Sequence, residues 1–407
     1  MGLLRVRLFS RALTGAFLIC LVANPVLLLA QNASPNHSVE EEATRSGLDR
    51  YYIMDYDGAI RDLERASAAA PADPFAVNHL LAAVLFRELY RAGALDTSLY
   101  SNNSFLNRRQ FPIDPAARER IRQLTDHALE LSEARLRSNP KDVDALYAHG
   151  VTRSLRSTYI GLVEKSWYTA LKSAWGARGD HEEVLRLSPG YADAKTVVGI
   201  HEYVAASLPF FIKVMAQLTG HGGSKEKGLA YLADAGARGR ESSADARIML
   251  AVFLRREQRF PEALEVARGL SAAYPRNFLF ALEEANILND AGRGPEAIAA
   301  YHKVLAEGRA GNFFDPHLEL VTWGLGESLR GQRQTAAAAE AYESILTFSR
   351  TEPELRRKAT LAAGEMYDLL QKRDLAVARY NAVITAQPDS DQADVARKRL
   401  REPYRLP

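Results

Sequence analysis

Cysteine is nearly absent from this chain of 407 residues, and the single one is Cys20. The rest of the chain therefore has no disulfide, no thiolate metal ligand and no cysteine nucleophile. An excess of one charge is also missing, since 52 basic and 50 acidic residues give a formal net charge of +2. Without a strongly basic surface, nucleic acid is not an expected partner. Glycine and proline, at 26 and 17 residues, are too few for a low-complexity chain.

The first thirty residues differ in kind from the rest. A mostly apolar run over residues 12–30 follows three arginines, Arg5, Arg7 and Arg11. This layout is typical of a secretory signal peptide, with cleavage after Ala30. The apolar run is about as long as the shortest membrane spans, so an uncleaved anchor formed by residues 12–30 is the alternative. Either way, we expect an exported protein of the periplasm or cell envelope, with membrane association through this segment if it stays attached.

The remainder of the chain repeats itself. In residues 357–390, Gly364 and Tyr367 lie three apart on one predicted helix, while Ala376 and Tyr380 mark a second helix that Pro388 closes. This unit resembles the tetratricopeptide repeat, which has small residues at places 8 and 20 and bulky ones at places 11 and 24 of 34. Frames that begin at residues 244, 278 and 319 fit the same pattern, with Ala251, Ala285 and Gly326 at place 8.

The repeat predicts an all-α fold: a right-handed superhelical array of antiparallel helix pairs, which is a tetratricopeptide-like solenoid. Small residues let two helices approach closely, and bulky ones fill the space between neighbouring pairs. We divide the chain into residues 31–243, with N-terminal and atypical repeats around a long central helix, and residues 244–390, the regular array. Residues 391–407 should form a capping helix and a frayed end.

The middle of the chain departs from the repeat. We expect helices over residues 74–92 and 115–139 around a polar loop, a long helix over 191–218 that Pro209 kinks, and a short helix over 225–237. An ordered set of residues here resembles the tetratricopeptide-repeat protein 39 and inclusion-body clearance family: Gly199, Leu208-Pro209, the glycines at 220–223, Gly228-Leu229 and Leu232. The resemblance implies an all-helical adaptor linked to lipid handling and aggregate clearance, although that family is intracellular.

No motif for catalysis is found. His201-Glu202 begins a zinc-protease pattern, but Ala205 stands where the second histidine ligand is needed. The glycines at 220–223 precede no Gly-Lys-Ser/Thr, and there is no Gly-x-Ser-x-Gly elbow. We therefore predict no enzyme, no metal and no cofactor, and we interpret His149 and His201 as ordinary packed or surface histidines.

A binding surface is the favoured hypothesis: a protein–protein interaction scaffold that holds a partner segment in its concave groove. Asparagine can bond a peptide backbone, arginine a carboxylate, and tryptophan can anchor an apolar group. Places 2, 5, 9 and 12 of the first helices would face the groove, and the candidates are Tyr147, Arg255, Asn286, Asn289, Trp323, Glu327 and Arg330. For each single residue, the alternative is a tolerated place on a wet surface.

A second hypothesis is a lipid- or membrane-associated adaptor that uses the apolar segment 204–218 of the central helix. The competing interpretation of this segment is the buried spine of a long helix.

Overall fold

The computed structural model describes residues 35–95, 113–207 and 222–406, and within these ranges it contains α-helices, one π-helix and no strand. The predicted all-α array of antiparallel helix pairs is confirmed. The N-terminal helices are α2 (Pro35–Tyr52), α3 (Tyr56–Ala69), α4 (Pro74–Arg91), α5 (Pro115–Ser138), α6 (Val143–Tyr159), the π-helix η3 (Ile160–Glu164), α7 (Trp167–Leu187) and α8 (Ala194–Ser207). The chain continues through α10 (Lys225–Arg238), α11 (Ser243–Arg256), α12 (Phe260–Ala273), α13 (Phe278–Asp290), α14 (Gly294–Arg309), α15 (Leu318–Gly331), α16 (Thr335–Ile345), α17 (Pro353–Leu369), α18 (Arg373–Ala386) and α19 (Asp391–Arg401).

Local sequence signals set where the helices begin. Asp73 caps α4 by accepting a hydrogen bond from the backbone N–H of Phe75, and Pro74 occupies the first turn, where its missing N–H costs nothing. Asp142 caps α6 in the same way by accepting from the N–H of Ala145. In α12 and α14 a proline likewise lies in the first turn, as the sequence predicted. These signals fix helix ends within a residue or two of the expected positions.

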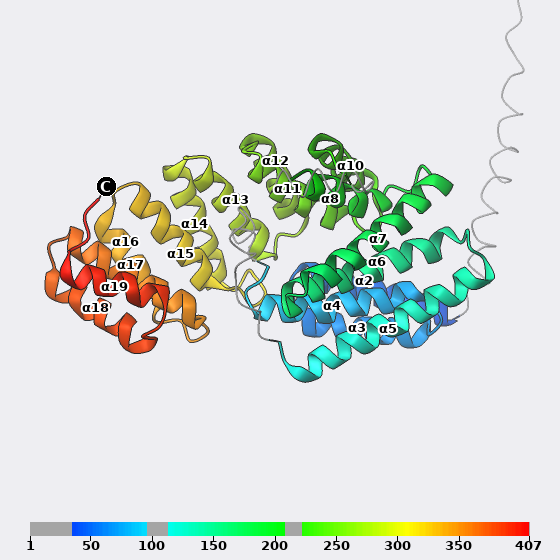
Figure 1. Ribbon diagram of the computed structural model, residues 1–407, viewed down its shortest axis with the longest axis horizontal. Coiled ribbons are helices and arrows are strands. Elements are labelled where there is room, and N and C mark those ends of the chain that lie inside the picture. Colours follow the sequence, from blue (N-terminus) through cyan, green and yellow to red (C-terminus); the bar gives the residue numbers. More distant parts are fainter. Residues whose placement is uncertain (1–34, 96–112, 208–221, 407) are drawn as a thin grey trace, which may run out of the picture.

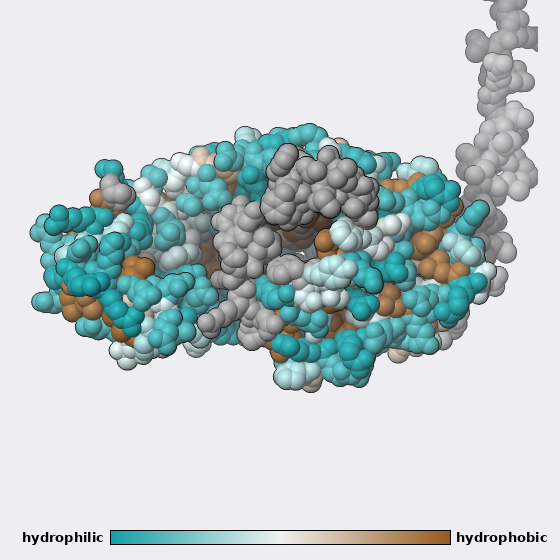
Figure 2. Space-filling model, viewed as in Figure 1, coloured by the Kyte–Doolittle hydropathy of each residue, from teal (hydrophilic) through white to brown (hydrophobic). Residues whose placement is uncertain are grey.

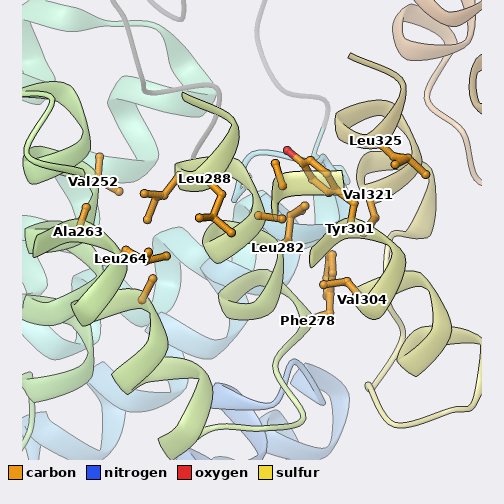
Figure 3. Packing of buried hydrophobic residues seen from close by; sticks show 14 of the residues in the cluster. Val252, Ala263, Leu264, Phe278, Leu282, Leu288, Tyr301, Val304, Val321 and Leu325 are labelled. Atoms are coloured by element: carbon orange, nitrogen blue, oxygen red, sulfur yellow. The ribbon is translucent and has the colours of Figure 1, made fainter. Parts of the chain in front are cut away.

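Helices that are adjacent in sequence pack side by side along an elongated, curved body (Figure 1). The face seen in Figure 2 is largely hydrophilic, with only small hydrophobic patches among the described residues. The main core lies between the helices: apolar side chains of α13 lie between those of α11–α12 and those of α14–α15 (Figure 3).

The repeat columns make the closest contacts in this core. The ring of Tyr380 on α18 lies over Gly364 on α17, and that of Tyr342 on α16 lies over Gly326 on α15. Both tyrosines are fully buried. Tyr301 also reaches the next pair, where it covers Gly324. The rings of the bulky residues therefore pack directly on the small residues, both within a helix pair and between neighbouring pairs.

The first helices of neighbouring pairs also contact each other directly, α8 with α11, α13 with α15 and α17 with α19. This closer approach places the first helices on the inner side of the curve. The inner face of the array is therefore built from α11, α13, α15 and α17, as the repeat predicted.

The N-terminal helices fold back onto the inner side of the array, which the repeat pattern did not predict. The Tyr90 hydroxyl of α4 donates to the carbonyl oxygen of Asp315 at 2.6 Å. The Asn277 amide donates to the carbonyl oxygen of Tyr52 at 2.7 Å, and the Tyr52 ring lies 4.9 Å from that of Tyr274. The predicted concave groove is thus covered by the N-terminal helices over α11–α13.

Other expectations need correction or lie outside the described residues. The central helix begins at Ala194 rather than at residue 191, and residues 208–221, with the predicted kink at Pro209, are not among those described. Residues 96–112 of the predicted polar loop and the N-terminal segment 1–30 are also outside them. The predicted frayed end is wrong up to Tyr404, whose N–H donates to Asp368 at 2.8 Å and whose ring lies under Arg330.

The described part of the chain contains no helix that combines the length and the apolar character needed to cross a bilayer.

The packing of tyrosine rings on glycines gives a testable prediction. A Cβ on Gly364 would lie 2.7 Å from Cε1 of Tyr380, whose hydroxyl is held by Asp368 at 2.7 Å. We expect Gly364→Ala to lower the free energy of unfolding by about 1 kcal/mol, because overpacking outweighs the gain in helix propensity. Thermal unfolding followed by circular dichroism measures this.

Gly179, in the middle of α7, is the matched control, because a Cβ there would meet nothing within 4 Å. We expect Gly179→Ala to raise the stability by up to about 1 kcal/mol through helix propensity. If both substitutions stabilise the protein equally, the contact between Gly364 and Tyr380 does not limit helix packing.

Candidate functional site

The predicted groove residues form a ladder of polar contacts across the inner face. Arg255 of α11 begins it: its Nε donates to Asp290 at 2.6 Å, and its guanidinium pairs with Glu283 at 3.2 Å. The residue is only 6% exposed, so its charge is satisfied inside the protein. Arg255 therefore joins α11 to α13 and does not offer an open guanidinium to a partner carboxylate. This corrects the role that the sequence suggested for it.

Asn286 and Asn289 lie on α13. Asn286 is buried and accepts a hydrogen bond from the Tyr301 hydroxyl at 2.8 Å. Asn289 is half-buried and accepts from the Ser328 hydroxyl at 2.5 Å, which ties α13 to α15. Of the two amides, only that of Asn289 keeps access to the groove.

Trp323, Glu327 and Arg330 lie on α15 and are all half-buried. The Trp323 ring lies 5.5 Å from that of Tyr342, and the Tyr342 hydroxyl donates to Glu327 at 2.5 Å. Burial raises the pKa of Tyr342, and the neighbouring Glu327 carboxylate raises it further, so this hydroxyl stays a donor. Arg330 pairs with Glu365 of α17 at 3.0 Å and donates to the Tyr404 hydroxyl at 2.8 Å.

The structure therefore brings together four half-buried groove residues on α13 and α15: Asn289, Trp323, Glu327 and Arg330. We call these four the inner strip. Each is held by a neighbour, which fixes its side chain before any partner arrives.

Tyr147, the remaining candidate, lies far from this strip on α6. It is 4% exposed, its ring stacks on Phe75 at 5.8 Å, and it lines an interior cavity of ≈ 390 Å³. The cavity lies where the N-terminal helices close over the array, with walls from α2, α4, α6, α8, α11 and α13. Its lining is mainly apolar and aromatic, and it includes Tyr51, Tyr52, Tyr56 and Phe280.

Asp245, in the first turn of α11, is the most perturbed acid of this cavity. The side chain is accessible to solvent and lies in the cavity wall with Tyr51, Tyr52 and Tyr147. The protein atoms around it raise its pKa to about 6 by desolvation, against smaller lowering effects from a Tyr52 hydrogen bond and from His79. It forms no ion pair with a described residue. Sequence reasoning missed Asp245, because nothing near it in the sequence indicates that the N-terminal helices return to cover it.

Two histidines of the cavity wall have a ring nitrogen without a hydrogen-bond partner among the described residues. His181 is fully buried; its Nδ1 bonds the carbonyl oxygen of Ala177 at 2.8 Å, while Nε2 has no partner. Burial lowers the pKa of His181 to about 4, so the ring is neutral, with the proton on Nδ1 and a lone pair on Nε2. His79 bonds Glu241 through Nε2 at 3.1 Å, and its Nδ1 lacks a partner.

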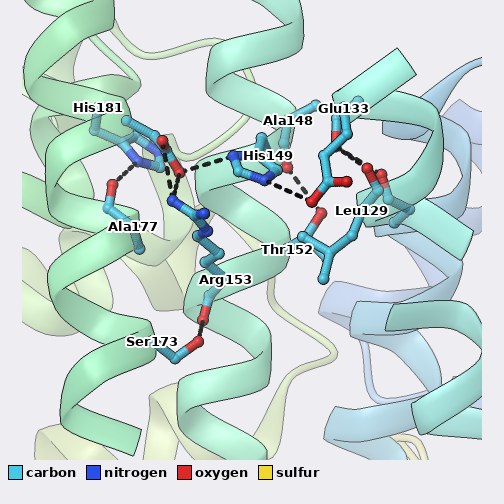
Figure 4. Close-up of polar contacts among 12 residues, drawn as sticks. Leu129, Glu133, Ala148, His149, Thr152, Arg153, Ser173, Ala177 and His181 are labelled. Carbon is cyan, nitrogen blue, oxygen red and sulfur yellow. Dashed lines mark hydrogen bonds and ion pairs between the residues drawn. The ribbon is translucent and has the colours of Figure 1, made fainter. Parts of the chain in front are cut away.

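His149 lies outside the cavity, and its Nε2 likewise has no hydrogen-bond partner among the described residues. It is buried between α5 and α7, with Nδ1 at 3.0 Å from Asp180 and Nε2 at 3.8 Å from Glu133 (Figure 4). Arg153 also pairs with Asp180, at 3.0 Å. This network joins α5, α6 and α7, and it gives His149 the structural role that the sequence analysis assigned. Within the residues described, no group of three or more histidine and acidic side chains is placed to hold a metal ion.

The helix pairs, the small-residue columns and the inner ladder define a solenoid of the tetratricopeptide-repeat type. The chain matches no protein-family model and no curated protein. It is similar to a chain of the Cut9–Hcn1 hetero-tetramer of the APC/C, with a TM-score of 0.48 and 13% identity over 92% of this chain and 58% of that chain. It thus spans little more than half the length of that protein.

Yeast Tom70 has a TM-score of 0.40 and 12% identity, over 89% of each chain. Pseudomonas aeruginosa PilF has a TM-score of 0.40 and 15% identity, over 64% of this chain and 99% of its own. Likeness at this level says nothing about a partner or an activity.

The raised pKa of Asp245 predicts a pH-dependent stability. Between pH 4 and about 6 the folded state binds more protons than the unfolded state, so stability falls as pH rises through this window. We expect Asp245→Asn to raise the free energy of unfolding at pH 7.5 by about 1 kcal/mol, a value reduced because the exposed side chain is partly solvated. The gain should vanish near pH 4, where both side chains are neutral.

Thermal unfolding at pH 7.5 and pH 4 checks this prediction. Asp126→Asn, at an exposed position of α5, is the control and should change little at either pH. If Asp245→Asn destabilises the protein equally at both pH values, the carboxylate has a structural role and is not a strained charge.

Proposed function

We propose that this protein is an interaction scaffold that binds an extended segment of a partner protein along the inner strip. The observation that carries the proposal is that Asn289, Trp323, Glu327 and Arg330 are half-exposed on one face and already held in place. A fixed side chain loses little conformational freedom on binding, which favours affinity.

The chemistry of the strip suits a peptide. Trp323 offers a flat apolar surface for one side chain, and tryptophan is among the residues that most often dominate binding energy. The Asn289 amide nitrogen is a donor for a peptide carbonyl, since its oxygen already accepts from Ser328. Because Glu327 and Arg330 carry opposite charges, the strip favours no strongly charged partner. Arg255 and Asn286 support this surface from below.

A library of displayed random peptides, selected on the full chain, tests the proposal. We expect selected peptides to lose at least tenfold in affinity on Trp323→Ala, which corresponds to about 1.4 kcal/mol. Tyr168→Ala is the matched control, because Tyr168 is an aromatic side chain on α7 that is 78% exposed and distant from the strip. Fluorescence polarisation with labelled peptide measures both variants.

If the peptides bind the Trp323→Ala and Tyr168→Ala variants equally well, the inner strip is not the docking surface. Circular dichroism of each variant shows whether the array stays folded.

We also propose that the protein is exported to the periplasm or cell envelope. The support is the sequence of residues 1–30, with three arginines, an apolar run and no acidic residue. The resemblance to the tetratricopeptide-repeat protein 39 and inclusion-body clearance family over residues 199–232 is not confirmed, since no family model and no curated protein matches the chain.

Expression of the full chain in a Gram-negative host tests export. We expect the protein in the periplasmic fraction, with Gln31 as its N-terminal residue because cleavage follows Ala30. N-terminal sequencing distinguishes this product from an uncleaved, membrane-bound chain that starts at Met1. A soluble, unprocessed chain in the cytoplasm would contradict export.

A further inference from the structure

The interior cavity is a second candidate site, separate from the inner strip. Its volume of ≈ 390 Å³ is within the range of cavities that hold small organic molecules. It exists only because the N-terminal helices close over α11–α13, so no single repeat pair contains it. The rest of the core is packed by interlocking side chains, and a space of this size is therefore not a routine packing defect.

The charge in the cavity wall has one sign. Four acidic residues line it, Asp193, Glu241, Asp245 and Glu283, and the described lining residues include no lysine and no arginine. Three of the four acids have partners in the protein. Asp193 accepts the backbone N–H groups of residues 240–242, Glu241 pairs with His79, and Glu283 pairs with Arg255.

Asp245 is the acid that lacks a cationic partner among the described residues, and it shares the cavity with four tyrosines, Tyr51, Tyr52, Tyr56 and Tyr147. Burial raises the pKa values of Tyr51, Tyr52 and Tyr147, and the charge of Asp245 raises each of them further. All three tyrosines line the same cavity as Asp245. Tyrosine faces attract cations, and a carboxylate near such rings strengthens that attraction.

Two histidines in the cavity wall, His181 and His79, each have one ring nitrogen without a hydrogen-bond partner among the described residues. Nε2 of the neutral, fully buried His181 is a hydrogen-bond acceptor that no described residue satisfies. Nδ1 of His79 is a second ring nitrogen without a partner among the described residues. Both nitrogens are covered by neighbouring atoms, so a donor in the cavity reaches them only if a side chain in the wall shifts.

A polar vestibule of ≈ 510 Å³ adjoins the cavity and shares Tyr52, His79 and Glu241 with it. Its described lining has more acidic than basic side chains: Glu40, Glu41, Asp49, Asp73 and Glu241 against Arg45 and Arg240. A negative entrance raises the local concentration of cations and lowers that of anions.

We propose that the cavity binds an apolar amine, a small molecule with an ammonium group on an apolar body, and that Asp245 is its counter-ion in the wall that the tyrosines share. The apolar body lies against the aliphatic walls of α4, α8 and α11. A fatty acid of the same size is disfavoured, because its carboxylate would meet acidic side chains and acceptors without a lysine or arginine. This site is independent of the proposed peptide scaffold.

Three probes that share one ten-carbon chain test the proposal: decylamine, decanol and decanoate. Isothermal titration calorimetry on the full chain at pH 7.5, below the micelle concentration of each probe, measures binding. We expect saturable one-to-one binding of decylamine, at least tenfold tighter than that of decanol, and the weakest binding for decanoate. Equal or tighter binding of decanoate would overturn the proposal, as would decylamine uptake without saturation.

Asp245→Asn keeps the shape of the wall and removes the charge, so it should weaken decylamine at least tenfold and leave decanol nearly unchanged. Asp126→Asn, on the outer surface of α5, is the matched control and should leave all three affinities as they are. If decylamine binds the Asp245→Asn variant as tightly as the unchanged protein, Asp245 is not the counter-ion. Ala82→Phe, which fills the cavity from α4, should lower the affinity for both decylamine and decanol.

Discussion

The fold depends on how closely two antiparallel helices can approach. A glycine or alanine at one place of the repeat receives a tyrosine ring from the partner helix, as Gly364 receives Tyr380. That contact sets the spacing within each pair, and Tyr301 on Gly324 extends it to the next pair. The curvature and the inner face follow from pairs stacked at this spacing.

Because the N-terminal helices cover part of the inner face, that face has two regions with different surroundings. Over α13 and α15 the first helices present a surface with half-exposed side chains. Over α11–α13 the N-terminal helices cover the same side, and the contacts of Tyr90 and Asn277 hold them there. One solenoid thus offers an exposed strip suited to a chain segment and a partly open cavity suited to a small molecule.

The two regions differ in how their polar groups are satisfied. In the ladder, Arg255 and Arg330 each pair with an acid of the neighbouring first helix, so their polarity stabilises the array. In the cavity, the Asp245 carboxylate has no cationic partner and Nε2 of His181 has no hydrogen-bond donor among the described residues. Polar groups without a partner inside a protein lower its stability, and they are common in binding sites.

The sequence by itself determined the helix pairs, because a period of 34 residues with small side chains at fixed places has few other packing solutions. It also placed Trp323, Glu327 and Arg330 on one helix face, since side-chain direction follows helical spacing. Only the tertiary structure decided that Arg255 is buried in an ion-pair network and that Tyr147 and Asp245 line one cavity. The first outcome depends on Glu283 and Asp290 of the next helix pair. The second depends on contacts between helices some two hundred residues apart, such as that of Tyr52 with Asn277, and no local pattern encodes them.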